Sequence, residues 1–490
     1  MSKTSTPTSG TKSPKPATAK PVLAVDLDGT LLRSDMLYES FWNLAAKDFP
    51  KAMRAALSLG RGKAALKRAI AQDAQVDVTL LPYNAEVLEF IKTWKSDGGT
   101  VALVTASDQV LADEIAAHLG VFDEVHGSDG ARNLKGPNKA AFLCERYGKG
   151  GFAYAGDHAA DVDVWAEAAH AVTVNADDAL RGKAEAVASD VTHLGHPPST
   201  VKAAVKALRP HQWMKNILVF IPMLLAHNIT FGTVLTGLLA FVVFSLVASS
   251  VYVLNDLLDL DADRNHARKC KRPFAAGDLP LSWGTGMATG LLAAGALLAL
   301  LLGPVFFFVM ACYYAATTAY SFYFKRRAVV DVAALAGLYT LRVIAGGVAI
   351  GVPLSPWLLA FSMFFFFALA AVKRQAELVD NLAAGKVKPT GRGYRNEDVA
   401  IMSQMAIGSG YVSILLLALY MNSPAVIELY SNPQILWGIC VVLLYWISRI
   451  VLLAHRGEMH DDPIIFAVRD HISRVCGLMV VGFALGASLT

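Results

Sequence analysis

The sequence is poor in charged residues, which make up 17% of its 490 positions, whereas soluble domains usually carry about 25%. Hydrophobic residues make up 54%. Residues up to about 208 have an ordinary polar composition, and residues from about 217 form long apolar runs between short charged loops. We therefore expect one soluble domain followed by one polytopic membrane domain.

Cysteine is also scarce, and no two cysteines form a CxxC pair. This spacing argues against a disulfide framework and against a zinc site. Residues 1–20 are rich in Ser, Thr, Pro and Lys and have no apolar core. They are expected to form a disordered tail rather than a secretory signal peptide, so the first domain should stay in the cytoplasm. The five cysteines are Cys144, Cys270, Cys312, Cys440 and Cys476.

The apolar half predicts nine membrane helices, each close to the length that spans a bilayer. If the first domain is cytoplasmic and the helices alternate, most Arg and Lys residues of this half fall in cytoplasmic loops, as the positive-inside rule requires. The expected location is the inner (cytoplasmic) membrane. The predicted helices are 217–235, 237–254, 282–301, 303–323, 331–350, 357–372, 402–421, 433–453 and 472–489.

The segment 255-NDLLDLDADRNHARKCKRPFAAG-277 places four acids at the end of an apolar run. Asp256, Asp259 and Asp263 are spaced i, i+3 and i+7, which puts three carboxylates on one face of a helix, while Asp261 points elsewhere. Carboxylates gathered in this way favour a divalent cation, and Mg²⁺ commonly binds carboxylates together with substrate phosphates. The Arg and Lys residues that follow suit a diphosphate substrate at the membrane surface. A solvated charged loop is the alternative.

NDxxDxxxD after the second of nine helices resembles the UbiA superfamily of intramembrane prenyltransferases, over about residues 205–490. The stretches 209-RPHQWMKN-216 and 331-DVAALAGLYTLRVIAGGVAIGVPLSPW-357 look like its decaprenyl-phosphate phosphoribosyltransferase branch. The resemblance implies Mg²⁺ bound by Asn255, Asp256, Asp259 and Asp263, with phosphoribosyl diphosphate (PRPP) and a polyprenyl phosphate as substrates. The candidate phosphate or substrate ligands are Lys215, Asn216, Arg264, Arg272, Tyr320, Lys325, Arg342, Lys373, Arg374 and Glu377.

This branch assignment has alternatives. The second DxxxD motif of typical aromatic prenyltransferases is replaced here by 373-KRQAELVD-380. A phosphorylated sugar donor would explain this more basic site, but a prenyl diphosphate donor is also open. Arg342 stands inside an apolar run, where a cation is costly and usually functional, although a structural pair with Asp331 or with a loop acid is the alternative.

In the soluble half, acids and hydroxyl residues follow buried strands. The strand in 22-VLAVDLDGTLL-32 ends at Asp26 and Asp28, the strand 100-TVALVTAS-107 contains Thr105, and the strand 151-GFAYAGD-157 ends at Asp157, four residues before Asp161. Strands that alternate with helices form a parallel sheet, and ligands bind at its carboxyl edge.

Together with the basic segment 132-RNLKGPNK-139, these residues match the four motifs of the haloacid dehalogenase (HAD) superfamily over about residues 21–195. The resemblance implies a Rossmann-like α/β fold with a helical cap at about 34–88. It makes Asp26 the nucleophile, Asp28 the general acid/base and Thr105 a phosphoryl ligand. Lys139 offsets the phosphoryl charge, with Lys135 as second candidate. Mg²⁺ would be held by Asp26, Asp157, Asp161 and the carbonyl of Asp28.

The two halves suggest a bifunctional enzyme, with a HAD phosphatase domain at 21–195, a linker with an amphipathic helix at 196–210 and an all-α UbiA-like domain at 211–490. The membrane half would transfer 5-phosphoribose from PRPP to the lipid phosphate, and the HAD half would remove the 5-phosphate. No nucleic-acid partner is expected. The alternatives are a prenyltransferase with an associated phosphatase, and a membrane-anchored phosphatase alone.

Overall fold

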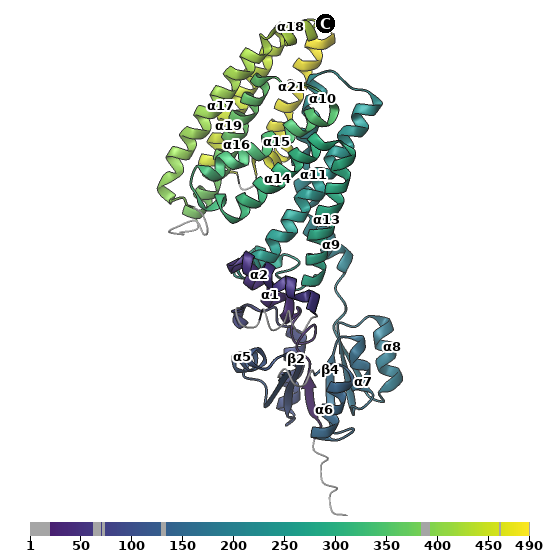
Figure 1. Ribbon diagram of the computed structural model, residues 1–490. Helices are drawn as coiled ribbons and strands as arrows, with labels where there is room; N and C mark the ends of the chain where they lie inside the picture. Colours follow the sequence, from purple (N-terminus) through teal and green to yellow (C-terminus); the bar gives the residue numbers. More distant parts are fainter. Residues whose placement is uncertain are drawn as a thin grey trace, which may run out of the picture. The chain divides into compact units, whose positions relative to one another are not determined.

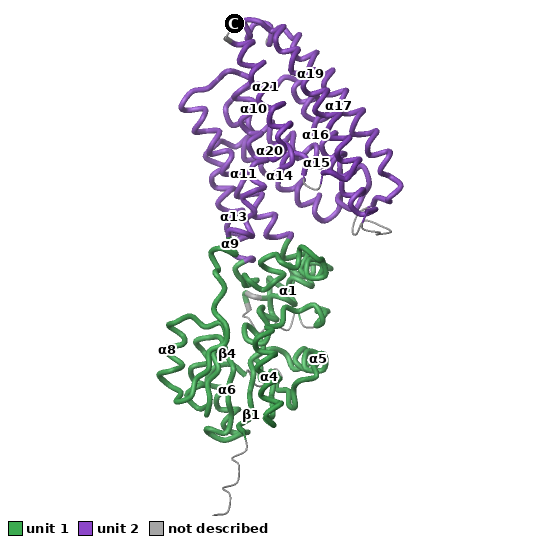
Figure 2. The backbone as a smooth tube through the Cα atoms, turned by 180° about the vertical axis from the view of Figure 1, so that it is seen from behind, with its two compact units in different colours: residues 1–204, 256–283 green, residues 205–255, 284–490 purple. Residues whose placement is uncertain are grey.

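The computed structural model describes residues 20–61, 70, 74–128, 134–383, 393–459 and 462–489. The chain forms two compact units (Figure 2): unit 1 consists of residues 1–204 and 256–283, and unit 2 of residues 205–255 and 284–490. The acidic segment 256–283 therefore belongs to unit 1, although it connects two long apolar helices. Except for Lys20, the expected tail at 1–20 lies outside the described residues.

Unit 1 contains a six-stranded sheet in the order β3-β2-β1-β4-β5-β6, in which all neighbouring strands are parallel (Figure 1). This confirms the predicted α/β fold. Successive residues of a strand face opposite sides, so Leu23 and Val25 pack in one core and Ala24 packs in the other. The strands are β1 Val22–Val25, β2 Val101–Asp108, β3 Glu124–Ser128, β4 Phe152–Gly156, β5 His170–Val174 and β6 Val191–Leu194.

Helices cover both faces of this sheet, as its buried strands require. The core on one face includes residues of α4 and α5, and the core on the other includes residues of α6, α7 and α8. These helices are α4 Ala85–Ser96, α5 Gln109–Leu119, α6 Pro137–Tyr147, α7 Val162–Trp165 and α8 Asp178–Val187. Helix α9, Thr200–Leu208, follows the last strand within the predicted linker.

The described residues between β1 and α4, a stretch predicted to be a helical cap, include the helices α1 Met36–Lys47 and α2 Phe49–Leu57 and the short 3-10 turns η1 Ser58–Arg61 and η2 Val78–Leu80. Asp35 caps α1, since its side chain accepts a hydrogen bond from the N–H of Leu37. The predicted helix 51–71 is described only in part, because residues 62–69 and 71 lie outside the described residues.

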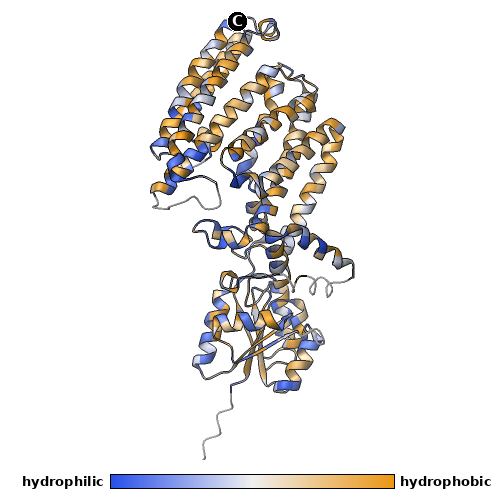
Figure 3. Cartoon of the chain, turned by 60° about the vertical axis from the view of Figure 1, so that its left-hand side comes forward, coloured by the Kyte–Doolittle hydropathy of each residue, from blue (hydrophilic) through white to orange (hydrophobic). Residues whose placement is uncertain are grey.

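Among the described residues, eight helices are long and apolar enough to cross a membrane, and Figure 3 shows hydrophobic residues along them. Helix α16 extends to Ala383, well beyond its predicted end at 372. Lys373, Arg374 and Glu377 therefore lie on the helix itself rather than in a loop. The eight are α11 Phe231–Leu258, α13 Leu281–Leu301, α14 Pro304–Phe322, α15 Val330–Ile350, α16 Pro356–Ala383, α17 Val399–Met421, α19 Trp437–His455 and α21 His471–Leu489.

Short helices connect these long ones. The acidic segment contains α12 Leu260–Arg264 and η5 Lys269–Lys271. The other connections contain η6 Phe324–Arg326, η7 Asn396–Asp398, α18 Pro424–Leu429, η8 Pro433–Leu436 and α20 Pro463–Arg469.

The prediction of nine membrane helices is not confirmed, because 217–235 does not form one helix. A 3-10 helix, η4 Pro210–Phe220, leads into the short α10, Ile221–Leu225, which ends before His227 at a φ of 48°. A non-glycine residue with positive φ cannot continue an α-helix. The hydropathy of this run is continuous, so the sequence pattern does not indicate the break at 226-AHNIT-230.

The segment 208–228 nevertheless runs antiparallel to α11 within unit 2. At one end, Ser249 of α11 accepts a hydrogen bond from the Trp213 indole N–H and donates one to the Leu208 carbonyl. At the other end, the Thr233 hydroxyl of α11 donates to the Asn228 carbonyl. The segment therefore follows most of the length of α11 without being a long helix.

Candidate functional sites

The predicted catalytic residues of unit 1 come together at the carboxyl edge of the sheet. Asp26 follows β1, Thr105 lies in β2, and Asp157 follows β4, and β1 is hydrogen-bonded to both β2 and β4. Neighbouring parallel strands end at the same edge, which explains why residues far apart in sequence meet there.

Lys139 and Tyr154 link two of the acids. The Nζ atom of Lys139 lies 2.7 Å from Oδ2 of Asp26 and 2.8 Å from the hydroxyl oxygen of Tyr154. That hydroxyl is also 3.2 Å from Oδ2 of Asp26 and 2.9 Å from Oδ1 of Asp161. Lys139 is almost fully buried, while Lys135 is exposed. The structure thus brings Lys139 to the predicted nucleophile.

Asp28 is held as a group that can both give and take a proton. Its Oδ1 accepts a hydrogen bond from the N–H of Met36, and its Oδ2 accepts one from the hydroxyl of Ser107. Burial, together with the charges of Asp35 and Asp26, raises the pKa of Asp28 to about 7. A carboxyl group with such a pKa suits general acid/base catalysis near neutral pH.

The carboxylates of Asp26, Asp157 and Asp161 fit a divalent cation. Each offers an oxygen within 4.8 Å of the others, and among the described residues no other such set of three occurs. Burial and the charges of Asp161 and Asp26 raise the pKa of Asp157 well above its ordinary value. A hard divalent cation, which prefers oxygen ligands, would relieve this repulsion.

Gly29 is needed for this geometry. It has a φ of 78°, and a Cβ at this position would lie 2.1 Å from Oδ2 of Asp157. Asp157 is oriented by Thr30, whose hydroxyl donates to Oδ1 at 3.0 Å. Sequence reasoning missed Thr30, Ser107 and Tyr154. The sequence feature that could have identified Tyr154 is a phenol in a buried strand whose other residues carry no polar side chain.

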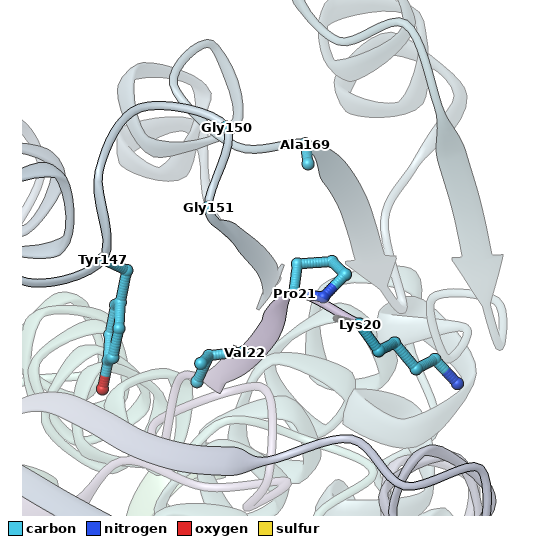
Figure 4. A pocket seen from close by; sticks show the side chains of 7 residues that line it. All are labelled: Lys20, Pro21, Val22, Tyr147, Gly150, Gly151 and Ala169. Carbon is cyan, nitrogen blue, oxygen red and sulfur yellow. The ribbon is translucent and has the colours of Figure 1, made fainter. Parts of the chain in front are cut away.

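A pocket of unit 1 lies at the opposite edge of the sheet (Figure 4). Its lining includes Val22 at the start of β1, Gly151 before β4 and Ala169 before β5. It is therefore separate from the acids at the carboxyl edge.

The Asp-rich segment of unit 1 is arranged around Arg272. The Nη1 atom of Arg272 lies 3.0 Å from Oδ1 of Asp256 and 2.5 Å from Oδ2 of Asp263, and both acids are almost fully buried. The other oxygen of Asp263, Oδ1, accepts no hydrogen bond from a described residue, and the Nζ atom of Lys269 is 4.0 Å away. This buried carboxylate oxygen fits a cation ligand.

The predicted single helix through these acids is interrupted. Asp256 lies in the last turn of α11, Asp259 stands between α11 and α12, and Asp263 lies in α12. The N–H of Asp263 still donates to the carbonyl of Asp259 at 2.7 Å, so the backbone keeps a helical hydrogen bond across the break. Asn255 is partly buried in α11. Arg264 is engaged by Glu39.

In unit 2, Lys215 and Lys373 share one carboxylate. Their Nζ atoms lie 2.8 and 2.9 Å from Oδ2 of Asp462, whose side chain is 7% exposed. Burial alone would raise the pKa of Asp462, but Lys373 and Lys215 bring it below its ordinary value. Sequence reasoning missed Asp462, and its signal was an acid directly before the proline that opens α20.

Arg342 is buried in unit 2 beside neutral groups rather than beside Asp331. Its Nε donates to Asn216 Oδ1 at 3.0 Å, its Nη2 to the Tyr313 hydroxyl at 2.8 Å, and its Nη1 to the Leu338 carbonyl. The alternative of a structural pair with Asp331 is therefore wrong. An arginine held by uncharged partners keeps its positive charge available to an anion.

Asp331 pairs instead with Arg374, whose Nη2 atom is 2.7 Å from Oδ2 of Asp331. Arg374 also contacts Glu377, and the Tyr394 hydroxyl donates to Asp331. Both members of the Arg374–Asp331 pair are fully buried. Tyr320 in α14 and Lys325 in η6 are partly buried.

Two family models match the chain. The UbiA prenyltransferase family matches residues 216–467, and the haloacid dehalogenase-like hydrolases match residues 23–166. The first match covers more than half of the chain. The chain belongs to the UbiA prenyltransferase family. Its UbiA half is fused to a HAD half, as the sequence motifs predicted, and it is an integral membrane protein.

Some relatives match most of the chain and others match only a part of it. Uncharacterized protein y4nM of Sinorhizobium fredii is 39% identical over 94% of this chain and 89% of its own length. Nodulation protein NoeC of Azorhizobium caulinodans is 37% identical over 57% of this chain and 91% of its own length. Decaprenyl-phosphate phosphoribosyltransferase of Mycobacterium tuberculosis is 41% identical over 37% of this chain and 62% of its own length.

Proposed function

We propose that the protein is a bifunctional enzyme that transfers 5-phosphoribose from PRPP to a polyprenyl phosphate and then removes the 5-phosphate from the product. The observation that carries this proposal is the joining of two parts in one chain. One is a cluster of Asp26, Lys139 and Asp161, linked through the Tyr154 hydroxyl and suited to phosphomonoester hydrolysis, and the other is a UbiA half similar to decaprenyl-phosphate phosphoribosyltransferases.

In the transfer step, an oxygen of the lipid phosphate attacks C1 of PRPP. The C1–O bond to the diphosphate breaks, and the diphosphate leaves with the electron pair. Mg²⁺ would neutralise the departing diphosphate when bound to Asp256, Asp259 and Asp263 with Asn255. Arg272, Lys215, Asn216 and Arg342 are the proposed phosphate ligands on the protein, with Lys373, Lys325 and Tyr320.

Arg374 and Glu377 have a different part in this proposal. Arg374 is fully buried against Asp331 and contacts Glu377, so we propose that this group fixes the position of the neighbouring Lys373 on α16 rather than binding phosphate itself.

In the hydrolysis step, a carboxylate oxygen of Asp26 attacks the phosphorus of the 5-phosphate, and the P–O bond to C5 of the ribose breaks. Asp28 gives its proton to the leaving oxygen. Water then attacks the aspartyl phosphate while Asp28 takes up a proton, and inorganic phosphate leaves. Lys139 offsets the negative charge of the phosphoryl group, and Thr105 is a proposed phosphoryl ligand. Mg²⁺ held by Asp26, Asp157 and Asp161 would supply further positive charge.

The two steps form a chemical sequence, because the product of the first is a phosphomonoester and HAD hydrolases act on this class. We propose that both sites face the cytoplasm. Residues 20–204 and the segment 256–283 belong to one compact unit, which supports placing the two aspartate motifs on the same side of the membrane. Segment 208–228 would then be the ninth crossing, since the chain must return through α11.

The experiment that tests this proposal is mass spectrometry of the lipid formed from polyprenyl phosphate, PRPP and Mg²⁺. Wild type should form the ribosyl lipid, Asp26→Asn should stop at the 5-phosphoribosyl lipid, and Asp259→Asn should leave the polyprenyl phosphate unchanged. Formation of the dephosphorylated lipid by Asp26→Asn at the wild-type rate would sink the second step. Failure of the wild-type protein to consume PRPP would contradict the proposed transfer step, and prenyl diphosphates would then be tested as donors.

A further inference from the structure

An ion pair within unit 1 joins the HAD half to the Asp-rich segment of the UbiA half. The guanidinium of Arg264 donates to both carboxylate oxygens of Glu39, at 3.0 Å from Nη1 and 2.6 Å from Nη2. The side chains of Glu39 and Arg264 are 2% and 6% exposed. Two parallel hydrogen bonds to one carboxylate fix both position and orientation.

Two further contacts support this pair. The Asn43 amide of α1 donates to Oδ2 of Asp261 at 3.0 Å, and Nη2 of Arg33 lies 3.0 Å from Oδ1 of Asp278. Gly277 approaches the chain so closely that a Cβ there would lie 2.6 Å from the carbonyl oxygen of Arg33. The segment is thus held at positions 261, 264, 277 and 278, on both sides of Arg272.

The same pair is linked to the phosphatase loop. Ser34 donates its hydroxyl to Oε1 of Glu39 at 2.5 Å, and its carbonyl accepts the N–H of Gly29 at 3.1 Å. Gly29 follows Asp28, and Arg264 follows Asp263. A short series of hydrogen bonds therefore connects the loop after the first HAD motif to the NDxxDxxxD motif.

We propose that Glu39 is a positioning residue of the transferase: through Arg264 it holds α12 in the conformation that presents Asp259 and Asp263 to the diphosphate donor. This inference rests on the proposed function. It also assigns Arg264 to positioning rather than to phosphate binding, because both of its terminal nitrogens are engaged by Glu39. On this proposal the buried ion pair contributes conformational specificity, as buried polar groups do in some proteins.

The consequence is that the phosphatase half is required for donor binding by the other half. If α12 lost its contact with Glu39, the segment would have to become ordered each time the donor binds. The apparent affinity for the donor would then fall in proportion to the fraction of protein in which the segment is already ordered. The loss should therefore appear in the KM for PRPP more than in kcat.

The test uses the full-length protein with Glu39→Gln, Arg264→Gln and the charge exchange Glu39→Arg/Arg264→Glu. Glu185→Gln is the matched control, because Glu185 also forms an ion pair in unit 1, with His193, but its side chain is 59% exposed. Diphosphate release at varied PRPP gives KM and kcat, hydrolysis of p-nitrophenyl phosphate reports the phosphatase, and hydrogen exchange of peptides from 260–281 reports the order of the segment.

Each single variant should raise the KM for PRPP about tenfold or more and speed hydrogen exchange in 260–281, and its p-nitrophenyl phosphate hydrolysis should fall by a smaller factor than the KM rises. The charge exchange should bring the KM for PRPP part of the way back to the wild-type value. Asn43→Ala, which removes only the hydrogen bond to Asp261, should increase the KM for PRPP by a smaller factor. It replaces the Glu39 variants as the test if those variants do not fold. Wild-type KM for PRPP in folded Glu39→Gln and Arg264→Gln would overturn the inference. If wild type consumes no PRPP, the proposed function fails, and the same comparison with a prenyl diphosphate donor decides the role of Glu39.

Discussion

The Nη1 atom of Arg272 lies 2.5 Å from Oδ2 of Asp263, in a position where one guanidinium serves two buried carboxylates of the NDxxDxxxD motif. Burial raises the pKa of Asp263, and the charge of Arg272 opposes that effect. An internal cation therefore compensates these acids, and an incoming divalent ion must compete with it.

Arg272→Gln should therefore increase the affinity of the motif for Mn²⁺ when no donor is present, by about tenfold, since one positive charge beside the ligands is removed. Electron paramagnetic resonance of Mn²⁺ measures this in an Asp157→Asn background, which weakens the other cation site. Lys269→Gln is the control, because Lys269 is 4.0 Å from Asp263 and 46% exposed. An unchanged Mn²⁺ affinity in Arg272→Gln would contradict the competition.

Gly29→Ala should reduce phosphatase activity by more than about 100-fold, because its Cβ would displace the Asp157 carboxylate and the residue would be strained at a φ of 78°. Gly120→Ala is matched to it, with a φ of 63° but no atom within 4 Å of the added Cβ. The control should lose only stability, about 1 kcal/mol. Equal losses of activity in the two variants would show that backbone strain, and not the Asp157 contact, is responsible.

Tyr154→Phe removes the hydroxyl that contacts Lys139, Asp26 and Asp161. We expect kcat for phosphomonoester hydrolysis to fall about tenfold, because Lys139 and Asp161 lose a shared hydrogen-bonding partner and become less well oriented. Steady-state kinetics of the purified protein measures the change. Tyr147→Phe, at the end of α6, is the control, and it should leave kcat within twofold.

The meeting of the predicted catalytic acids could be anticipated from sequence, since Asp26 and Asp157 follow two neighbouring strands and a parallel sheet brings strand ends together. Lys139 was proposed only through the HAD resemblance, and the structure brings it, rather than the exposed Lys135, to Asp26. Tyr154 and Ser107 could not be found in this way. A phenol in a buried strand and a serine near a strand end are both common, and only the packed structure shows which acids they contact.

The membrane half was less predictable, because hydropathy reports burial but not backbone geometry. It located eight long helices yet read 217–235 as another one, although His227 adopts a positive φ. Charge pairing was also hidden. A pair of Asp331 with Arg342 was only an alternative in the sequence, and Asp331 pairs instead with Arg374 from the next long helix, while no sequence pattern links Asp462 to Lys215.

Glu124 predicts a pH-dependent stability of unit 1. Hydrogen bonds from Tyr147, His126 and Arg146 lower the pKa of Glu124 to about 2. A carboxyl group with a lowered pKa in the folded state stabilises the protein above its ordinary pKa, and the gain is lost as the pH falls from about 4.5 towards 2.

Glu124→Gln should therefore reduce the free energy of unfolding by about 1 kcal/mol at pH 7, a value kept small because the side chain is 31% exposed. The difference from wild type should narrow steadily below pH 4.5. Thermal unfolding of unit 1, followed by fluorescence at several pH values, measures it. A constant difference between pH 7 and pH 3 would mean that packing, rather than charge, explains the effect.

Asp462→Asn should destabilise unit 2, because Lys215 and Lys373 would lose the carboxylate that they share in a buried position. Removing one partner of a buried ion pair costs about 3 kcal/mol, and here two ammonium groups lose their partner. Thermal unfolding in detergent should show a lower midpoint for unit 2 and an unchanged one for unit 1. Glu428→Gln, an exposed acid of α18, is the control.

Adding Lys373→Met to Asp462→Asn restores the wild-type charge of the cluster and should recover part of the lost stability. If the single variant unfolded at the wild-type temperature, the contacts of Asp462 with the two lysines would not stabilise unit 2.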